Sequence, residues 1–560
     1  MNQERTRAQQ SRAAIERLYI AMRHLFIRGG YKPLGVSGEA MIEALRVLQP
    51  EIYGSINDPE RVELDGLFYI FQRLPTGIEE CRFIHLISRE GFENSQFQAI
   101  VPPRRRRNCY RIDHEEMYIE MTRGRSDIYD ILTHLTFMYV ESEKIRHNSE
   151  DHMKRKRREW QMLEKIVEKE NRGEEIDKEV AFTYLSVLLG RTYEEVTAAY
   201  QRFESDPNVN SLFHITYWLG KLSTQEEYEK IDREITFSSA LREKVGHHYY
   251  GELWAGNIKQ FLWDNGLLDR PLHIISANLH SVMNCLFAPK ALKKTDLPLE
   301  ELAREVSLDE NSQMRKTILA HALKNGLYQL DDTSGTNISV QIIDTAKIGP
   351  KMLPPELGTP KQSGKHPQPV IFVMDYAFGE QAYETLDELL KPFEYDGKRY
   401  PLNVASINIM GKAGILEGAK GDIMVPTAHV FEGTADNYPI DNDFHKADFA
   451  GFGLEVFEGP MISVLGTSLQ NKDILQYFLR SSWGAVGLEM EGAHYQKAIQ
   501  AATMIRKSGV GKNVVLRYAY YASDNPLITG HTLASGSLGV DGVKPTYLIT
   551  IKILERIMGG

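Results

Sequence analysis

The residues best suited to chemistry lie in the last third of the chain, where carboxylates follow apolar segments. One apolar segment ends in Glu489, Met490 and Glu491, after which a Gly-Ala pair opens a helix. Side chains two residues apart share one face within a strand, but two carboxylates at a strand end can point to opposite faces where the strand stops between them. We therefore expect one of them to meet a ligand and the other to have a structural role. A carboxylate is a strong acceptor for the paired hydroxyls of a sugar.

A third acid, Asp524, lies where another apolar segment ends. Ser523 precedes it, and Asn525 and Pro526 start a loop directly after it. In open α/β sheets, ligand sites lie at such carboxyl ends of strands. Considered alone, Asp524 could cap a turn and Glu491 could be an acid at a helix N-terminus. A functional role for either residue depends on the other segments.

Two further segments complete the set. Gly411, Lys412 and Gly414 follow an apolar run, and closely spaced glycines let a backbone approach a ligand. Glu380 ends the polar segment 375–380, which comes directly after the continuous apolar run 370–374. As an isolated residue, Glu380 is equally an ordinary first-turn acid of the helix that follows it.

In this order and spacing, Gly-Lys-Ala-Gly with Gly-Asp-Ile, Leu-Glu-Met-Glu-Gly-Ala and Ser-Asp-Asn resemble the nucleoside phosphorylase and nucleosidase superfamily. The resemblance covers residues 370–560. The usual form of the second motif is Asp-Met-Glu-Gly-Ala, and this chain has Glu489 where Asp is usual. The resemblance implies an α/β domain with a mixed central sheet flanked by helices. It also implies a small-molecule purine nucleoside or nucleotide as substrate, and neither a cofactor nor a metal.

The resemblance also implies roles for individual residues. Glu491 would accept the ribose hydroxyls, and Met490 would pack under the sugar. Asp524, oriented by Ser523, would protonate or hydrogen-bond N7 of the purine. A proton at N7 stabilises the departing base while the sugar develops oxocarbenium character.

Other residues would support this site. Gly411, Lys412, Gly414 and Glu489 would form the loop and the surroundings of the ligand. The stretch Gly-Thr-Ser-Leu before the Glu491 motif resembles that of AMP nucleosidase-like members, which adds Thr467 and Leu469 as base-pocket candidates and makes an AMP-like nucleotide a reasonable substrate.

The nucleophile separates hydrolysis from phosphorolysis. Within residues 370–479 the only arginine is Arg399, and Lys412 lacks the bidentate fork of a guanidinium. Glu380 stands where resembling nucleosidases place the base that activates water, after the first strand. Hydrolysis is therefore expected. Two alternatives remain: a phosphorylase that uses Lys412 and an arginine from the N-terminal region or another subunit, and a nucleotide-sensing protein without turnover.

The elements that must position these residues alternate between apolar runs and amphipathic helices beyond residue 370, which predicts a mixed, largely parallel sheet. Residues 1–265 show helical spacing, for example over 14–26 and 128–145, and predict a large, mostly α-helical N-terminal domain. Residues 266–346 predict an α+β connecting segment. Residues 347–369, rich in Pro, Gly and Lys, predict a linker.

The bulk composition excludes several classes of protein. With a net charge of −10, the chain is not a general nucleic-acid binder. No apolar run reaches the length of a membrane span, the first residues are not those of a secretory signal, and three scattered cysteines predict neither a disulfide framework nor a zinc site. These features favour the cytoplasm. Self-association into a homo-oligomer is expected from the resemblance.

Several remaining clusters of charged or polar residues are expected to have structural rather than functional roles. The basic runs 104–107 and 154–158 could bind an anion, but a solvated loop and helix face is the favoured interpretation. Residues 113–152 contain enough acids and histidines for a di-metal centre, yet lack paired Glu-x-x-His motifs. His247 and His248 are expected to pack rather than ligate. The turn at 276–278 resembles a small nucleotide-binding turn without a glycine fingerprint.

Overall fold

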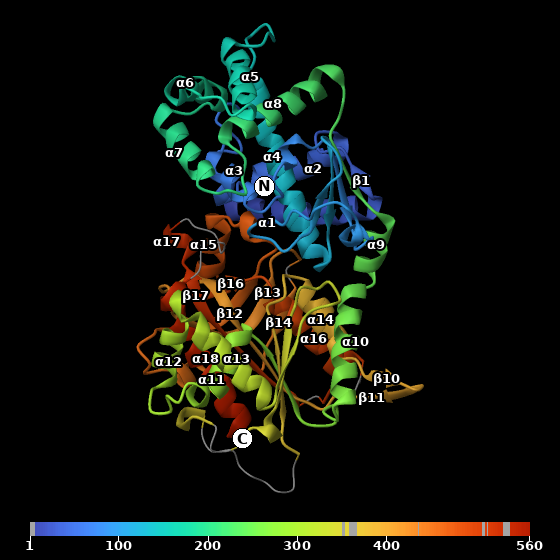
Figure 1. Cartoon of the computed structure of the whole chain (residues 1–560), viewed down its shortest axis with the longest axis vertical. Helices are drawn as coiled ribbons and strands as arrows, with labels where there is room; N and C mark the ends of the chain where they lie inside the picture. Colours follow the sequence, from blue (N-terminus) through green and yellow to red (C-terminus); the bar gives the residue numbers. More distant parts are fainter. Residues whose placement is uncertain are drawn as a thin grey trace, which may run out of the picture. The chain divides into compact units, whose positions relative to one another are not determined.

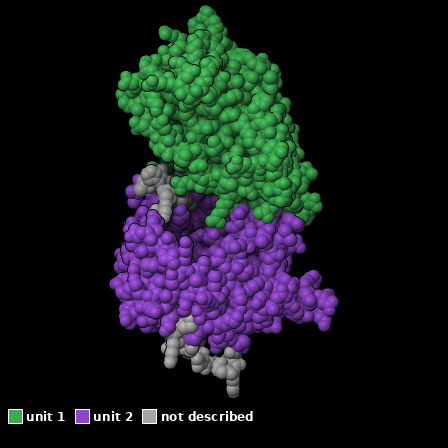
Figure 2. Space-filling model, viewed as in Figure 1, with its two compact units in different colours: residues 1–247, 468–474 green, residues 248–467, 475–560 purple. Residues whose placement is uncertain are grey.

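The computed structural model describes residues 6–349, 353–357, 367–434, 436–506, 510–511, 513–529 and 538–559. The chain forms two compact units (Figure 2). Residues 1–247 and 468–474 make up the first unit, and residues 248–467 and 475–560 make up the second. Each unit contains its own sheet and its own helices (Figure 1).

The first unit packs helices around a five-stranded sheet with the order β1-β5-β2-β4-β3. Its strands are β1 (Gly30–Tyr31), β2 (Phe83–Ile87), β3 (Cys109–Arg111), β4 (Glu116–Glu120) and β5 (Glu234–Phe237). Its helices are α1 (Arg7–Arg28), α2 (Val36–Leu48), α3 (Leu64–Phe71), α4 (Gly124–Asn148), α5 (Arg158–Asn171), α6 (Lys178–Leu189), α7 (Tyr193–Glu204), α8 (Leu212–Glu229) and α9 (Ser239–Gly246). The prediction of a mostly helical region therefore missed a sheet, because strands of two to five residues are too short to show a period.

Helix α1 shows how local sequence sets the bounds of an element. Thr6 and Gln9 form a reciprocal capping box at its start, and Gly29 ends it in the left-handed conformation at φ 94°. Ile15, Leu18 and Met22 lie on one buried face, as their spacing predicts.

The second unit contains a ten-stranded mixed sheet with the order β14-β13-β15-β16-β12-β6-β9-β8-β7, and β17 pairs with both β12 and β13. The strands are β6 (Leu272–Ser276), β7 (Leu327–Leu330), β8 (Val340–Asp344), β9 (Val370–Met374), β12 (Val404–Ile415), β13 (Ile423–Phe431), β14 (Asn437–Pro439), β15 (Val456–Ser463), β16 (Gly487–Glu489) and β17 (Val515–Asp524). A separate hairpin joins β10 (Phe393–Tyr395) to β11 (Lys398–Tyr400). The mixed sheet of the predicted α/β domain is therefore present.

Helices cover both faces of this sheet (Figure 1). Those that supply residues to its two cores are α10 (Tyr249–Asp264), α11 (Leu279–Ala291), α12 (Leu299–Val306), α13 (Ser312–Lys324), α14 (Gln381–Leu389), α16 (Gly492–Gln500) and α18 (Val543–Met558). Two further helices are α15 (Lys472–Arg480), whose first three residues belong to the first unit, and α17 (Pro526–Thr529). Alternate residues of β9 enter different cores. Phe372 packs with the core of α10, α14 and α16, while Val373 packs with that of α11, α12, α13 and α18. This burial on both faces explains the continuous apolar run of β9.

Part of the sheet closes on itself. Strand β12 pairs with β17, β17 with β13, β13 with β15, β15 with β16, and β16 again with β12. The ring forms because β12 is long. Its first half pairs with β6, and its last residues, Gly414 and Ile415, pair with β16 on the same edge. The segments that carry the predicted site all start or end on this small barrel or beside it.

The sheet also includes strands from the segment predicted to be a connection. Strand β6 lies between β12 and β9, and β8 and β7 extend the sheet beyond β9. The second unit therefore begins at residue 248, well before residue 370. Of the predicted linker 347–369, residues 350–352 and 358–366 lie outside the described residues.

Candidate active site

The candidate site is built where β12 ends. Gly414 pairs with Asp524 of β17 on one side and with Leu488 of β16 on the other. Neighbouring strands lie about 4.8 Å apart, so Asp524 and Leu488 are about 10 Å apart at their Cα atoms. The fold thus brings the Gly411–Gly414 segment, the Glu489–Glu491 segment and Asp524 to one part of the barrel rim. The glycine segment is a strand there rather than the loop expected from its sequence.

Glu489 is an internal carboxyl that organises the start of α16. It accepts the N–H of Glu491 at 2.6 Å and also the N–H of Gly492, and Ser463 of β15 donates its hydroxyl to the other oxygen. Burial raises the pKa of Glu489 to about 7, even though these hydrogen bonds favour the charged form. Glu489 therefore holds the backbone of Glu491 and Gly492 at the start of α16.

Gly492 is required by the close approach of His429. A Cβ atom at position 492 would lie 2.2 Å from Nε2 of His429, a distance that real Cβ atoms do not show. His429 is fully buried on β13, and its Nε2 lies 3.2 Å from the hydroxyl of Tyr520. Burial lowers the pKa of His429 to about 3, so the ring is neutral at physiological pH. Close packing against His429 therefore explains why the Glu-Gly-Ala motif has glycine at position 492.

Glu491 is half-buried at the start of α16 and points towards the segment after β9. Its Oε1 accepts the N–H of Gly379 at 2.9 Å. Tyr495, one turn further along α16, places its hydroxyl 3.0 Å from Oγ of Ser276 at the end of β6. The start of α16 is thereby tied to the carboxyl ends of both β9 and β6. Met490 is buried beside Glu491.

Glu380 is the residue after Gly379, which places it near Glu491. It precedes α14, and its negative charge acts on the buried ring of His494, whose pKa burial lowers to about 4. The prediction of a base at Glu380 requires β9 to be the first strand of its sheet. The first strand in chain order is β6. The turn after β6 carries Asn278, His280 and Ser281, and no carboxylate.

Asp524 is buried at the end of β17. The hydroxyl of Ser523 lies 2.7 Å from Oδ1 of Asp524 and 3.1 Å from the carbonyl oxygen of Ala413. The amide nitrogen of Asn525 donates to the carbonyl of Gly418 at 3.2 Å. These contacts fix the Asp524 segment to β12 and to the turn that follows β12, as the predicted orienting role of Ser523 requires.

A cavity of about 870 Å³ opens at the carboxyl ends of the same strands. Asn278 after β6, Tyr376 after β9, Lys412 of β12 and Tyr521 of β17 line it, together with Arg315 of α13. Helix α11 leaves β6 towards one face of the sheet, and α14 leaves the adjacent β9 towards the other. This is a topological switch point, where α/β folds bind ligands. Among the described residues, the lining does not include Glu380, Glu491 or Asp524.

Lys412 and Arg315 are the cations of this cavity. Lys412 is exposed and, within the described ranges, makes no hydrogen bond or ion pair. Arg315 donates to the carbonyls of Val306 and Leu308 at 2.8 and 2.6 Å, so much of its guanidinium holds its own loop. The expectation from sequence missed Arg315, because residues 312–324 are remote from the motifs. Asn278, in the turn that resembles a small nucleotide-binding turn, lines this cavity.

Thr467 and Leu469, the base-pocket candidates, occupy one short helical turn (Thr467–Leu469). Thr467 belongs to the second unit, whereas Leu469 is buried in the first. In the first unit, the side chain of Asn471 donates to the carbonyl of Leu48 at 2.8 Å and fixes the segment that contains Leu469.

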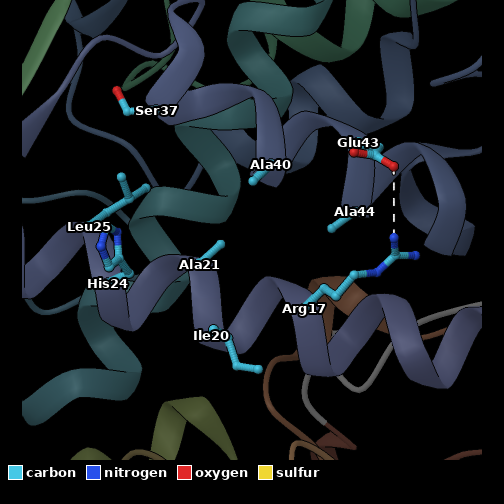
Figure 3. A pocket seen from close by; sticks show the side chains of 9 residues that line it. All are labelled: Arg17, Ile20, Ala21, His24, Leu25, Ser37, Ala40, Glu43 and Ala44. Carbon is cyan, nitrogen blue, oxygen red and sulfur yellow. Dashed lines mark ion pairs between the residues drawn. The ribbon is translucent and has the colours of Figure 1, made fainter.

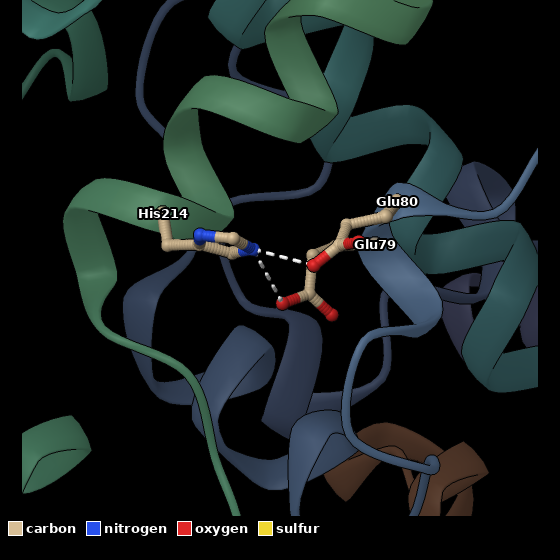
Figure 4. A group of neighbouring side chains, drawn as sticks. All are labelled: Glu79, Glu80 and His214. Carbon is tan, nitrogen blue, oxygen red and sulfur yellow. Dashed lines mark hydrogen bonds and ion pairs between the residues drawn. The ribbon is translucent and has the colours of Figure 1, made fainter. Parts of the chain in front are cut away.

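Other clusters of the first unit offer less chemistry. A groove of about 290 Å³ between α1 and α2 is mainly apolar, and its one ion pair joins Arg17 to Glu43 at 3.7 Å (Figure 3). Glu79, Glu80 and His214 lie within metal-ligand distance of one another (Figure 4).

Hydrogen bonds and ion pairs within the protein explain why Glu79, Glu80 and His214 lie close together. His214 Nε2 lies 2.7 Å from Glu80, which Arg111 also contacts at 2.8 Å, and Asn210 donates to Glu79. Among the described residues this is the only such group, so the acids and histidines of 113–152 form none. His248 packs edge-on against Tyr383, as expected.

The basic runs differ from each other. Residues 154–158 are mostly exposed, as expected, with Lys156 over the ring of Trp160. The solvated loop predicted for 104–107 is wrong for two of its residues. Arg107 is 1% exposed, and the Arg105 side chain is 11% exposed. Both are buried because they pair with Asp127 and Asp130 of α4.

Comparisons with known proteins place the chain in a family. Residues 39–306 and 302–559 match a family described as of unknown function (DUF6909). No curated protein matches the chain. No described helix is long and apolar enough to cross a membrane.

Several solved structures are similar to part of the chain. A futalosine hydrolase mutant of Helicobacter pylori strain 26695 is 11% identical, with 52% of this chain and 99% of that chain covered and a TM-score of 0.29. A 5'-methylthioadenosine/S-adenosyl homocysteine nucleosidase of Campylobacter jejuni is 10% identical, with coverages of 51% and 98% and a TM-score of 0.31. An AMP nucleosidase of Bacteroides thetaiotaomicron is 14% identical, with coverages of 56% and 97% and a TM-score of 0.30.

Proposed function

The chain belongs to the DUF6909 family, and we propose that it cleaves the N-glycosidic bond of a purine nucleoside or nucleotide by hydrolysis. One observation carries the proposal. The carboxylate of Glu491 accepts the N–H of Gly379, the residue before Glu380. Asp524 pairs with Gly414 on one side, and Leu488, which leads into the Glu489–Glu491 segment, pairs with Gly414 on the other. Acids from three separate strand ends therefore gather at one rim, as a reaction needing both a proton donor and a hydroxyl acceptor requires.

In the proposed reaction, the proton of Asp524 moves to N7 of the purine as the C1'–N9 bond breaks. The bond's electron pair leaves with the base, and the proton neutralises it. Ser523, 2.7 Å from Oδ1 of Asp524, orients the carboxyl for this transfer. The negative charge of Glu491 supports the cationic sugar and accepts its hydroxyls.

Water completes the reaction by adding to C1', and a carboxylate takes its proton. Glu380 is proposed for this step because it is the residue after Gly379, to which Glu491 is bonded. An AMP-like nucleotide is the favoured substrate, and its phosphate would meet Lys412 or Arg315 in the neighbouring cavity, which Asp309 and Glu310 also line. Thr467 stays a candidate for contact with the base.

Phosphorolysis is the second candidate, and the same two cations favour it. A phosphorylase needs an anion site near the sugar, and Lys412 is exposed to the cavity without an ion pair in the described part of the chain. In that case phosphate rather than water would add to C1', and Glu380 would have no catalytic role.

Release of free base from AMP and adenosine, measured with and without inorganic phosphate, tests the proposal. Hydrolysis predicts adenine and a free sugar or sugar phosphate in phosphate-free buffer. Strict dependence on phosphate, with formation of a sugar 1-phosphate, would replace hydrolysis by phosphorolysis. Binding of AMP without release of base, by the full chain at high enzyme concentration, would point to a nucleotide sensor and contradict both reactions.

A further inference from the structure

The basic run 104–107 leads into a charged centre inside the first unit. Arg105 donates to both oxygens of Asp130, at 2.8 and 2.7 Å. Arg107 donates to Asp130 at 2.5 Å and twice to Oδ1 of Asp127, at 3.1 and 2.8 Å. Each of these carboxylates is thus engaged by a guanidinium of the run.

Arg73 is a third guanidinium of this centre, and it donates no hydrogen bond to Asp127 or Asp130 in the described residues, although Oδ2 of Asp127 is itself buried without a hydrogen-bond partner. It is 5% exposed and lies flat against Tyr69, with its Cζ 3.4 Å from the ring centroid. One NH1 bond goes to the Tyr69 carbonyl at 2.8 Å. In the part of the chain that the structure describes, Arg73 has no ion pair and its buried Nε–H has no acceptor.

The charges of the centre do not balance. Arg105 and Arg107 pair with the two carboxylates of Asp127 and Asp130. Arg73 adds a third guanidinium near Asp130, and the charge of Arg123 also acts on Asp127. His134 lies 3.4 Å from Asp130 but adds no cation, because burial lowers its pKa to about 4. A buried cation without a counter-ion is costly, so a site of this kind is stable when an anion occupies it.

The free edge of Arg73 defines the chemistry of that anion. Its Nε–H and NH2 group form a planar fork, which matches two oxygens of one oxyanion. The run lies beside the Arg73 backbone, since the Arg104 N–H donates to the Gln72 carbonyl and Arg107 NH1 donates to the carbonyl of Arg73. The side chains of Arg104 and Arg106 are exposed on the same loop. A loop with several arginines next to Arg73 favours a doubly charged oxyanion over a carboxylate.

We propose that Arg73 and the 104–107 loop form a binding site for a phosphate group in the first unit. The phosphate is either inorganic or the phosphoryl group of a nucleotide. The proposal concerns binding and does not depend on the glycosidase reaction, because its residues belong to a different unit from Glu491 and Asp524.

Binding of inorganic phosphate, AMP and adenosine to the full chain, measured by calorimetry at constant ionic strength, tests the site. Arg73→Met keeps the long side chain against Tyr69 and removes the fork. We expect phosphate binding to weaken about 10- to 100-fold, the factor lost with a charge-assisted hydrogen bond. Arg17→Met, which removes one exposed cation from α1, is the matched control and should bind like the wild type.

The arms of the experiment distinguish the two sources of phosphate. A nucleotide site predicts that Arg73→Met weakens AMP and leaves adenosine unchanged. A site for the free ion predicts weaker phosphate binding with AMP unchanged. Binding of neither ligand to the wild type at millimolar concentration, or equal binding by both proteins, would overturn the proposal.

A second measurement covers the case in which Arg73→Met fails to fold. Phosphate should raise the Tm of the wild type relative to chloride at the same ionic strength, and acetate should not. Arg73→Lys, which keeps the charge without the fork, should lose most of that rise. No rise in the wild type, or an equal rise with acetate, would overturn the proposal. Adenine release from adenosine reports the glycosidase separately, so either idea can fail alone.

Discussion

Asp130 in the first unit and Glu489 in the second are both buried carboxyl groups, and they differ in what surrounds them. Asp130 receives hydrogen bonds from Arg105 and Arg107. Burial by itself would raise the pKa of Asp130, but the charge of Arg105 and its hydrogen bonds hold it well below the usual range. Glu489 receives only neutral donors, and burial raises its pKa to about 7.

Burial therefore does not decide whether a carboxyl is charged; the charge of its partners does. In the first unit Asp130 acts as a permanent counter-ion of Arg105 and Arg107. In the second unit Glu489 holds the Glu491 segment through N–H and O–H donors alone and can carry a proton near neutral pH. This contrast makes separate predictions for stability and for activity.

The largest expected effect is on activity, from Glu491→Gln. The amide oxygen of Gln can still accept the Gly379 N–H, so the fold should persist, but the charge that supports the cationic sugar is lost. We expect kcat/KM for base release to fall about 10³-fold, equivalent to about 4 kcal/mol of transition-state stabilisation. Glu394→Gln, in the exposed β10–β11 hairpin, is the control for loss of one charge. Unchanged kcat/KM would remove Glu491 from the mechanism.

Next in size is the effect of Asp130→Asn on stability. The substitution leaves Arg105 and Arg107 buried with one carboxylate fewer, and breaking a buried pair costs about 3–5 kcal/mol. Urea unfolding should show this loss in the free energy of unfolding. Asp65→Asn, at an exposed pair with Arg202, should cost no more than about 1 kcal/mol. A loss at Asp130 as small as the control's would mean that the arginines are compensated elsewhere.

Glu489→Gln should change the pH dependence of stability. The folded state holds the Glu489 proton up to about pH 7, whereas the unfolded chain releases it near 4.5. Glu489 therefore contributes on the order of 3 kcal/mol to the free energy of unfolding below pH 4.5, and this contribution is lost as the pH rises towards 7. Urea unfolding of the variant should lack this decline between pH 4.5 and 7. The same slope in both proteins would show that Glu489 ionises normally.

The smallest effect is expected for a substitution at Gly492, whose N–H donates a hydrogen bond to Glu489. Gly492→Ala must displace the buried His429 ring, and such overpacking costs about 1–3 kcal/mol in unfolding free energy. Gly256→Ala on α10, where a Cβ meets nothing within 4 Å, should instead stabilise by about 0.5–1 kcal/mol. Thermal unfolding would compare the two variants. A neutral Gly492→Ala would mean that His429 can move without cost.

Local pattern predicted much of the second unit. Strand β16 ends in Glu489, as expected from the apolar segment before it. This feature depends on a few consecutive residues. Side chains two residues apart share a face within a strand, so Glu489 and Glu491 have different partners because β16 ends at Glu489.

Features that join distant residues were not predictable. The closure of β12 onto both β17 and β16 and the insertion of β6 beside β12 depend on pairings between residues more than 70 positions apart. The burial of Arg107 depends on Asp127, on another element. A run of four arginines looks solvated until the carboxylates that neutralise it are placed. The role of Arg73 in that centre has no local signal at all.

The central claim is that Asp524 delivers the proton that releases a purine base. Its most direct test is adenine release from AMP and adenosine by Asp524→Asn, with the wild type and Glu394→Gln assayed in parallel. An amide cannot donate that proton, so we expect base release to fall at least about 10³-fold while unfolding stays cooperative. Base release at the wild-type rate by a folded Asp524→Asn would contradict the account.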